Sequence, residues 1–237
     1  MRINRFINEE SQTAFAPKWD YVLGEDFLIK DLSYWDTVKD IILEKEKQIL
    51  STTSPINANA GSVDGYTGLG KNSLTSRFQH FNVFNWQEPE LTPIKELITH
   101  KYLEFLQRLN APRRKVWIQC WANVMRDGEV IQPHMHGAGP FSYLGGHVCV
   151  THNNTSTFYM HTVNQINSPG VYESKNEPGK ITLFQSCIPH YTSVNNSGRE
   201  RITIAFDFIV DEDPHNKNNL VLLDKGIEQN MYKYKVA

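Results

Sequence analysis

Two histidines lie two residues apart at the end of the segment 127–136, which reads DGEVIQPHMH. On an extended segment, side chains at positions i and i+2 point to the same face. His134 and His136 can therefore bind one metal ion if a third ligand comes from elsewhere in the chain. Imidazole is a ligand for Fe, Zn, Cu and Ni, so the pair alone does not select the metal.

A third histidine and an arginine follow in the C-terminal half. Arg201-Ile202-Thr203 begins eleven residues after His190 and opens an apolar stretch. On a strand that starts at Arg201, Arg201 and Thr203 share the face opposite to the apolar side chains, which would line the lumen of a small barrel. A buried guanidinium requires an anionic partner, and Asp207, farther along the same strand, is the acidic candidate. A bound dicarboxylate would fill the same role.

Short strands in the second half of the chain must position these residues. β-Branched and aromatic residues between turn residues predict strands at 116–125, 146–150, 157–159, 180–184 and 201–210. The first part of the chain has helical periodicity instead. We expect one helix at 33–50 with Ser33 as its N-cap, and another that starts at Thr92-Pro93 with Thr92 as its cap. Residues 1–30 are expected to form an irregular arm with a short strand at Asp26–Lys30. Helices followed by strands make an α+β chain whose second half is a β-sandwich or barrel.

The order of these motifs resembles the Fe(II)/2-oxoglutarate oxygenases. The chain reads Asn-x-Met-x-x-Gly-x5-His-x-His from Asn123, then Pro-Gly-x4-Phe in 178–184, then His190, and then Arg-x-Thr from Arg201. Members of this superfamily commonly carry His-x-Asp, a distal histidine and Arg-x-Ser beyond it. The layout is similar to prolyl-hydroxylase-type proteins, and more so to small bacterial and phage members with a His-x-His segment. The resemblance covers residues 116–210.

The resemblance implies a double-stranded β-helix, a jelly-roll or cupin-like barrel on which the N-terminal helices pack, with an iron ion at its mouth. His134 and His190 match the two histidine ligands of the superfamily. His136 stands where the superfamily usually has Asp or Glu, and it is the natural third ligand. The expected metal set is therefore three imidazoles around Fe(II).

The resemblance also implies a pocket for 2-oxoglutarate. Arg201, helped by Thr203, matches the anchor for the distal carboxylate of this co-substrate. Asn123 matches an asparagine that some members place near the co-substrate, and Tyr143 is a further candidate for the same pocket. The implied activity is that of an Fe(II)- and 2-oxoglutarate-dependent dioxygenase, most simply a hydroxylase. Its partners would be 2-oxoglutarate, O2 and a small-molecule or peptide substrate.

Two other functions remain open because position 136 is an imidazole. Gly128-x5-His134-x-His136 fits the start of a cupin motif, and three-histidine cupin dioxygenases do not use 2-oxoglutarate. The later cupin glutamate and the second cupin motif are missing here, and Arg201 with Thr203 would have no use in such an enzyme. The third possibility is a non-catalytic β-barrel binding module, since a fold does not guarantee chemistry.

The remaining histidines and one glycine-rich segment are expected to have ordinary roles. His147 and His152 flank a strand and would face solvent, and His161 would lie at the surface. The segment 65–72 approaches a P-loop but ends in Asn72, which cannot supply the magnesium-binding hydroxyl. We expect it to form a loop near the barrel mouth.

Composition limits the remaining functions. The 237 residues suit one domain, with a helical part at 1–112, a barrel core at 113–212 and an extension at 213–237. A net charge of -2 argues against a dedicated nucleic-acid or anionic-membrane binder. The three cysteines form no C-x-x-C pair, which fits free thiols in the cytoplasm. No apolar run predicts a signal peptide or a membrane span.

Overall fold

The computed structural model describes residues 1–7, 15, 19–55, 67–137, 143–151, 154–161, 170–210 and 232–234 of the chain. The strands of a large sheet are β1 (Arg2–Ile7), β2 (Asp20–Phe27), β3 (Val116–Met125), β4 (Leu144–Cys149), β7 (Lys180–Gln185), β9 (Arg201–Val210) and β10 (Tyr232–Tyr234). Those of a small sheet are β5 (Ser156–Met160), β6 (Val171–Lys175) and β8 (His190–Thr192). Both sheets are antiparallel, in the orders β1-β2-β7-β4-β9-β3-β10 and β6-β5-β8.

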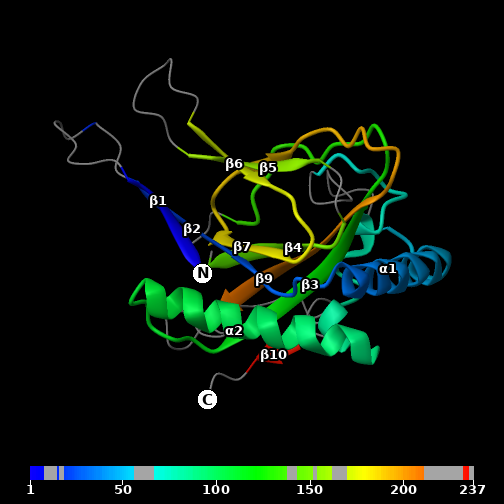
Figure 1. The fold of residues 1–237 in the computed structure, drawn as a ribbon, viewed down its shortest axis with the longest axis horizontal. Helices are drawn as coiled ribbons and strands as arrows, with labels where there is room; N and C mark the ends of the chain where they lie inside the picture. Colours follow the sequence, from blue (N-terminus) through cyan, green and yellow to red (C-terminus); the bar gives the residue numbers. More distant parts are fainter. Residues whose placement is uncertain are drawn as a thin grey trace.

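Two α-helices cover one face of the large sheet, and the small sheet lies on the other side (Figure 1). The helices are α1 (Leu32–Thr52) and α2 (Thr92–Arg108), and three single turns, η1 (Thr75–Arg77), η2 (Val83–Asn85) and η3 (Pro89–Leu91), connect them. Both predicted helices are confirmed, but their predicted caps are wrong. Asp31 caps α1 by accepting from the backbone N–H of Ser33, and Thr92 is the first helical residue of α2. None of the helices in the described ranges combines the length and apolar character that crossing a bilayer requires.

The alternation along β9 decides which face of the large sheet is apolar. Its even-numbered positions from Ile202 to Phe208 are buried in the main hydrophobic cluster together with residues of both helices. Its odd-numbered positions from Arg201 to Asp207 line a cavity on the opposite face. The predicted division of this strand into an apolar face and a lumen face is therefore confirmed.

The expectation of an irregular arm at residues 1–30 is wrong. β1 pairs with β2, and β2 pairs with β7 in a register that places Leu23 opposite Phe184. This pairing satisfies backbone groups of β7 that would otherwise lie at an open edge of the sheet. Most of the predicted extension 213–237 lies outside the described residues, but its β10 pairs with β3 at the other edge. Strands from both ends of the chain thus complete the sheet that carries the lumen face.

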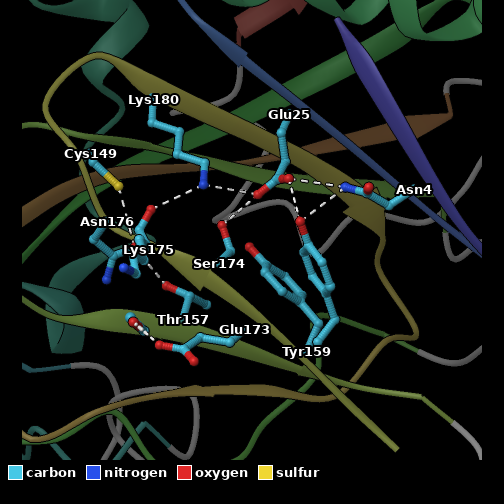
Figure 2. Close-up of polar contacts among 12 residues, drawn as sticks. Asn4, Glu25, Cys149, Thr157, Tyr159, Glu173, Ser174, Lys175, Asn176 and Lys180 are labelled. Carbon is cyan, nitrogen blue, oxygen red and sulfur yellow. Dashed lines mark hydrogen bonds and ion pairs between the residues drawn. The ribbon is translucent and has the colours of Figure 1, made fainter.

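A buried polar cluster joins the large sheet to the small sheet (Figure 2). Glu25 of β2 accepts hydrogen bonds from Ser174 and Tyr172 of β6, each at 2.6 Å, and pairs with Lys180 of β7 at 3.0 Å. Burial opposes ionisation of Glu25, but these donors outweigh it and hold the pKa of the carboxyl below its ordinary value. The cluster fixes β6 over β2 and so closes one end of the space between the sheets.

Candidate metal centre

The side chains of His134, His136 and His190 converge in the cavity between the two sheets. Each offers one ligand atom, and these three atoms lie within 4.8 Å of one another. Among the described residues, this is the group of histidine, cysteine and acidic side chains that could hold a metal ion. The sequence therefore predicted a set of residues that the fold brings together.

Backbone hydrogen bonds hold the three histidines at these positions. His134 and His190 form an isolated antiparallel bridge, with N···O distances of 3.0 Å and 2.9 Å in the two directions. The backbone N–H of His136 donates to the carbonyl oxygen of Ser186 at 3.0 Å. The His-x-His segment is thus tied to the chain between β7 and β8, and it brings the i and i+2 side chains to the same side as His190.

Hydrogen bonds with backbone carbonyl oxygens fix the Nδ1 atoms of two of the three imidazole rings. Nδ1 of His134 lies 2.8 Å from the carbonyl oxygen of Gln132, and Nδ1 of His190 lies 3.1 Å from that of Ile188. A carbonyl oxygen only accepts, so each Nδ1 carries the proton and each Nε2 keeps its lone pair. This is the arrangement in which metal-binding histidines are oriented by their outer hydrogen bonds.

Burial keeps His190 in the neutral form that a metal ligand must have. Desolvation lowers the pKa of His190 well below its ordinary value, and the neighbouring His134 and His136 lower it further. A neutral imidazole needs no deprotonation before it binds a metal ion. The environment of His190 therefore favours metal binding at neutral pH.

Asp207 contacts His136 rather than Arg201. Its Oδ1 lies 2.5 Å from Nδ1 of His136. The expectation that Asp207 could be the anionic mate of Arg201 is therefore wrong, because the two side chains leave β9 toward different groups. Gly145 of β4 faces Asp207 in the sheet, and a Cβ on this glycine would come within 2.9 Å of His136 Nδ1 and 3.2 Å of Asp207 Oδ1.

Arg201 is buried in the same cavity, where it is only 3 % exposed, and no carboxylate among the described residues pairs with it. Its Nε donates to Thr155 Oγ1 at 3.2 Å and its Nη2 to Thr157 Oγ1 at 3.3 Å. With its amide oxygen turned toward the guanidinium, Asn176 also accepts from Nε and Nη2. Figure 2 shows the contact between Thr157 and Asn176. Nη1 has no partner.

An unpartnered guanidinium nitrogen in a buried cavity indicates a place for an anion. Desolvation lowers the pKa of Arg201 from its ordinary value, yet an arginine remains charged at neutral pH. Leaving a buried donor unpaired costs free energy, and a carboxylate that accepts from Nη1 would remove this cost. The neutral acceptors around Nε and Nη2 orient the guanidinium without neutralising it.

Two of the other predicted residues line the cavity and one does not. Thr203 lies next to Arg201 on the lumen face, and Asn123 of β3 faces it in the sheet. The amide oxygen of Asn123 accepts from Thr75 at 2.6 Å and from Trp121 at 3.1 Å. The placement of Tyr143 in this pocket is wrong. Its hydroxyl lies 3.3 Å from that of Tyr102 in α2, because Tyr143 precedes β4 and its side chain packs with the helical layer.

His147 is a cavity residue that the sequence interpretation placed in solvent. It is buried and lines the cavity, and no residue in the described part of the chain partners its Nε2, while its Nδ1 lies 3.4 Å from the hydroxyl of Tyr159. Burial, followed by the nearby Arg201, lowers the pKa of His147 to about 3. The period-two alternation from Gly145 to His147 on β4 was the available signal, because it places His147 on the lumen face. His152 lies outside the described residues, and His161 stacks on Phe6 with ring centroids 4.6 Å apart.

The remaining wall of the cavity is apolar. It is formed by Phe78, Trp121, Ile131, Met135 and Phe184. Met135 lies between two of the metal-binding candidates and is 47 % exposed, so this wall reaches the surface. Thr67, in the loop expected at the barrel mouth, also lines the cavity and accepts from the backbone N–H of Gln132 at 2.7 Å. The cavity therefore combines three imidazoles, a buried cation and an apolar entrance.

Comparisons with known proteins agree with this arrangement. Residues 119–207 match the sequence model of the family described as "Putative 2OG-Fe(II) oxygenase". No curated protein matches the chain in sequence. The fold is similar to a Pseudomonas putida prolyl-4-hydroxylase, with a TM-score of 0.52 and 9% identity over 79% of this chain and 91% of that chain. It is also similar to a Trichoplax adhaerens prolyl hydroxylase in complex with a hypoxia inducible factor peptide fragment, with a TM-score of 0.53 and 13% identity over 80% and 83% of the two chains.

The matched segment runs from within β3 to within β9 and contains the three histidines and Arg201. The two prolyl hydroxylases, at such low identity, support the double-stranded β-helix fold alone. The family match and the histidine triad together support Fe(II) and 2-oxoglutarate as the cofactor and co-substrate. Residues 119–207 are therefore similar in sequence to the 2-oxoglutarate- and Fe(II)-dependent oxygenases.

Proposed function

We propose that this dioxygenase holds Fe(II) with His134, His136 and His190 and binds 2-oxoglutarate against Arg201. The observation that carries the proposal is the unpartnered Nη1 of Arg201 in the same cavity as the convergent imidazoles. A metal ion alone would not require a buried cation nearby. A dicarboxylate bound to the metal requires both the metal ion and a cation for its second carboxylate.

The three imidazoles fit Fe(II) in ligand type and in protonation state. Two of them are oriented by backbone carbonyl oxygens and the third by Asp207. Three protein ligands leave further coordination positions for a co-substrate and O2. Bound Fe(II) would supply the activation of O2 that couples decarboxylation of 2-oxoglutarate to oxidation of a substrate C–H bond.

The polar inner wall would orient 2-oxoglutarate. Arg201 Nη1 would donate to its distal carboxylate, and the hydroxyl of Thr203 lies beside it on the lumen face. His147 presents its unpartnered Nε2 to the same cavity. If the hydroxyl of Tyr159 donates to Nδ1, then Nε2 carries the proton and is a second donor for the carboxylate. Asn123 would present its amide N–H groups, since its oxygen already accepts two hydrogen bonds.

The apolar entrance would receive the substrate and exclude water from the centre. Trp121 and Phe184 lie beside His136, with ring centroids 5.6 Å and 5.5 Å from its ring. Met135 lies at the exposed rim of the same wall. We therefore propose that the oxidised position belongs to an apolar part of a small molecule or a peptide, and that the reaction is a hydroxylation.

Uncoupled turnover tests this proposal without knowledge of the substrate. Purified protein incubated with Fe(II), 2-oxoglutarate and O2 should release succinate slowly, and a His190→Ala variant should release none above background. Both proteins should have the same thermal unfolding midpoint to within a few degrees, so that loss of activity reports loss of the metal. A three-histidine dioxygenase that does not use 2-oxoglutarate, or a binding module, would release no succinate in either case.

A further inference from the structure

We propose that Asp207 is a positioning residue that supplies, through His136, the negative charge that the three imidazoles do not provide. The inference rests on the proposed metal site, and it concerns a residue that is not itself one of the three ligands. Three imidazoles are neutral when they bind metal, whereas a site with two histidines and a carboxylate carries one negative charge. In this chain the missing negative charge must come from a residue outside the three ligands.

The geometry assigns that charge to Asp207. Its Oδ1 lies 2.5 Å from Nδ1 of His136, while the corresponding nitrogens of His134 and His190 face neutral carbonyl oxygens. Of the three histidines, His136 is thus the one whose Nδ1 contacts a carboxylate. The side chain of His136 is only 7 % exposed and that of Asp207 is 21 % exposed, so the contact is partly removed from solvent.

The residues around Asp207 neither form a competing ion pair with it nor separate it from His136. Among the described residues, no lysine or arginine forms an ion pair with Asp207. Gly145 stands opposite Asp207 in the sheet, and any Cβ there would lie within 3.2 Å of its Oδ1 and 2.9 Å of His136 Nδ1. A glycine at this position therefore leaves the space in which the carboxylate and the imidazole meet.

A carboxylate that accepts from Nδ1–H makes Nε2 of the same ring a stronger ligand. It fixes the tautomer, holds the ring plane and draws the Nδ1 proton toward itself, which raises electron density at Nε2. A charged acceptor forms a stronger hydrogen bond than a neutral one. An asparagine in place of Asp207 would keep the hydrogen bond and remove the charge, and so isolates the electrostatic part of the contact.

The contact between Asp207 and His136 also predicts how the substitution His136→Asp should change metal binding. This substitution introduces a carboxylate ligand, but it also places two carboxylates beside each other, and their like charges repel. Alone it should therefore weaken metal binding. Combined with Asp207→Asn it should restore binding, because the introduced amide can donate to the introduced carboxylate. The double variant would then hold one negative charge at the site, now on the ligand at position 136 instead of on the supporting residue at position 207.

Anaerobic titration with Co(II), followed by its visible absorption bands, tests the proposal in the purified full chain. We expect Asp207→Asn to weaken Co(II) binding by about 10–100-fold, the range for supporting residues of metal-binding histidines. His136→Asp should also weaken it. The double variant should bind Co(II) more tightly than either single variant, with its bands shifted from those of the wild type. Glu173→Gln removes an exposed charge from β6 outside the cavity and serves as the control, with wild-type affinity expected.

The outcomes separate this inference from the proposed function. A wild type that binds no Co(II) contradicts the metal site itself. A wild type that binds Co(II), with Asp207→Asn binding equally well, overturns the role of Asp207 alone. A double variant weaker than both single variants would show that Asp207 only supports the fold, which also overturns it. If Asp207→Asn does not fold, Gly145→Ala decides, because it separates the pair without removing either side chain, and unchanged Co(II) affinity in that variant overturns the proposal.

Discussion

In the proposed function, recognition of 2-oxoglutarate depends on Arg201. We expect Arg201→Met to lose the charge-assisted hydrogen bond to the distal carboxylate, which costs about 1.5–3 kcal/mol. This is roughly a 10–150-fold loss of 2-oxoglutarate affinity, since 1.4 kcal/mol corresponds to a factor of ten. Calorimetric titration of the metal-loaded protein measures it. Metal affinity should stay unchanged, because Arg201 contacts none of the three histidines, and unchanged 2-oxoglutarate affinity would show that the anchor lies elsewhere.

His147 offers a second test at the residue scale. Its Nε2 has no partner in the ranges that the structure describes, and burial keeps the ring neutral by lowering its pKa to about 3. We expect His147→Leu to reduce 2-oxoglutarate affinity several-fold while Co(II) affinity is retained. Calorimetric titration with 2-oxoglutarate, as for Arg201→Met, and titration with Co(II) measure the two affinities. Loss of Co(II) binding instead would mean that His147 supports the metal site. If neither affinity changes, His147 does not contact 2-oxoglutarate.

The residues that the sequence predicted well are those whose positions follow from local geometry. His134 and His136 are two residues apart, and Arg201 and Thr203 alternate with apolar neighbours on one strand, so period-two alternation sufficed for both pairs. Tyr143 was misplaced because it precedes β4, where alternation does not apply. His147 was misplaced because the sequence does not show that β4 lies between β7 and β9, with both faces covered.

At the scale of elements, a charged cluster joins β2 to α2. Lys101 contacts Asp26 and Glu104, each at 2.7 Å. Partial burial acts to raise the pKa of Asp26, but hydrogen bonds from Lys101 and the amino group of Met1 outweigh it and lower the pKa to about 2. Hydrogen bonds from the same two groups lower the pKa of Glu104 to about 2. Both carboxyls therefore bind protons more weakly in the folded chain than in the unfolded chain.

These shifts predict how stability changes with pH. Groups with depressed folded pKa values stabilise the fold above their unfolded values near 4, and the contribution disappears as pH falls toward about 2. We expect Lys101→Met to lower the free energy of unfolding at pH 6 and to flatten its decline between pH 5 and 2. Urea unfolding of both proteins across this range measures the difference. Parallel curves for the two proteins would show that Lys101 does not cause the shifts.

The elements that the sequence missed are held by non-local pairing. Strands 116–125 and 201–210 were predicted with their observed bounds because each is a long apolar run, and three further strands were placed to within two residues. β1 and β2 were expected to be irregular, since their polar residues give no clear alternation. β2 is a strand because it pairs with β7 and because β6 supplies partners for Glu25. Neither condition is visible in a local stretch of sequence.

At the scale of the whole molecule, one sheet separates two environments. Its outer face packs on α1 and α2 in a continuous apolar cluster, and its inner face lines the cavity that holds the proposed metal and 2-oxoglutarate sites. The stability of the fold and the chemistry of the site are thus assigned to opposite faces of the same strands. This explains how the two prolyl hydroxylases share the fold at only 9% and 13% identity, since many apolar sequences can fill the outer face.

The central claim is that one cavity binds Fe(II) and 2-oxoglutarate together. Anaerobic addition of Fe(II) and 2-oxoglutarate to the purified chain, followed by visible absorption, tests it most directly. We expect a metal-to-ligand charge-transfer band that needs both additions, is absent in His190→Ala and requires a higher 2-oxoglutarate concentration in Arg201→Met. No band in a wild-type protein that binds Fe(II) would contradict the claim, because the metal and the co-substrate would then not meet in this cavity.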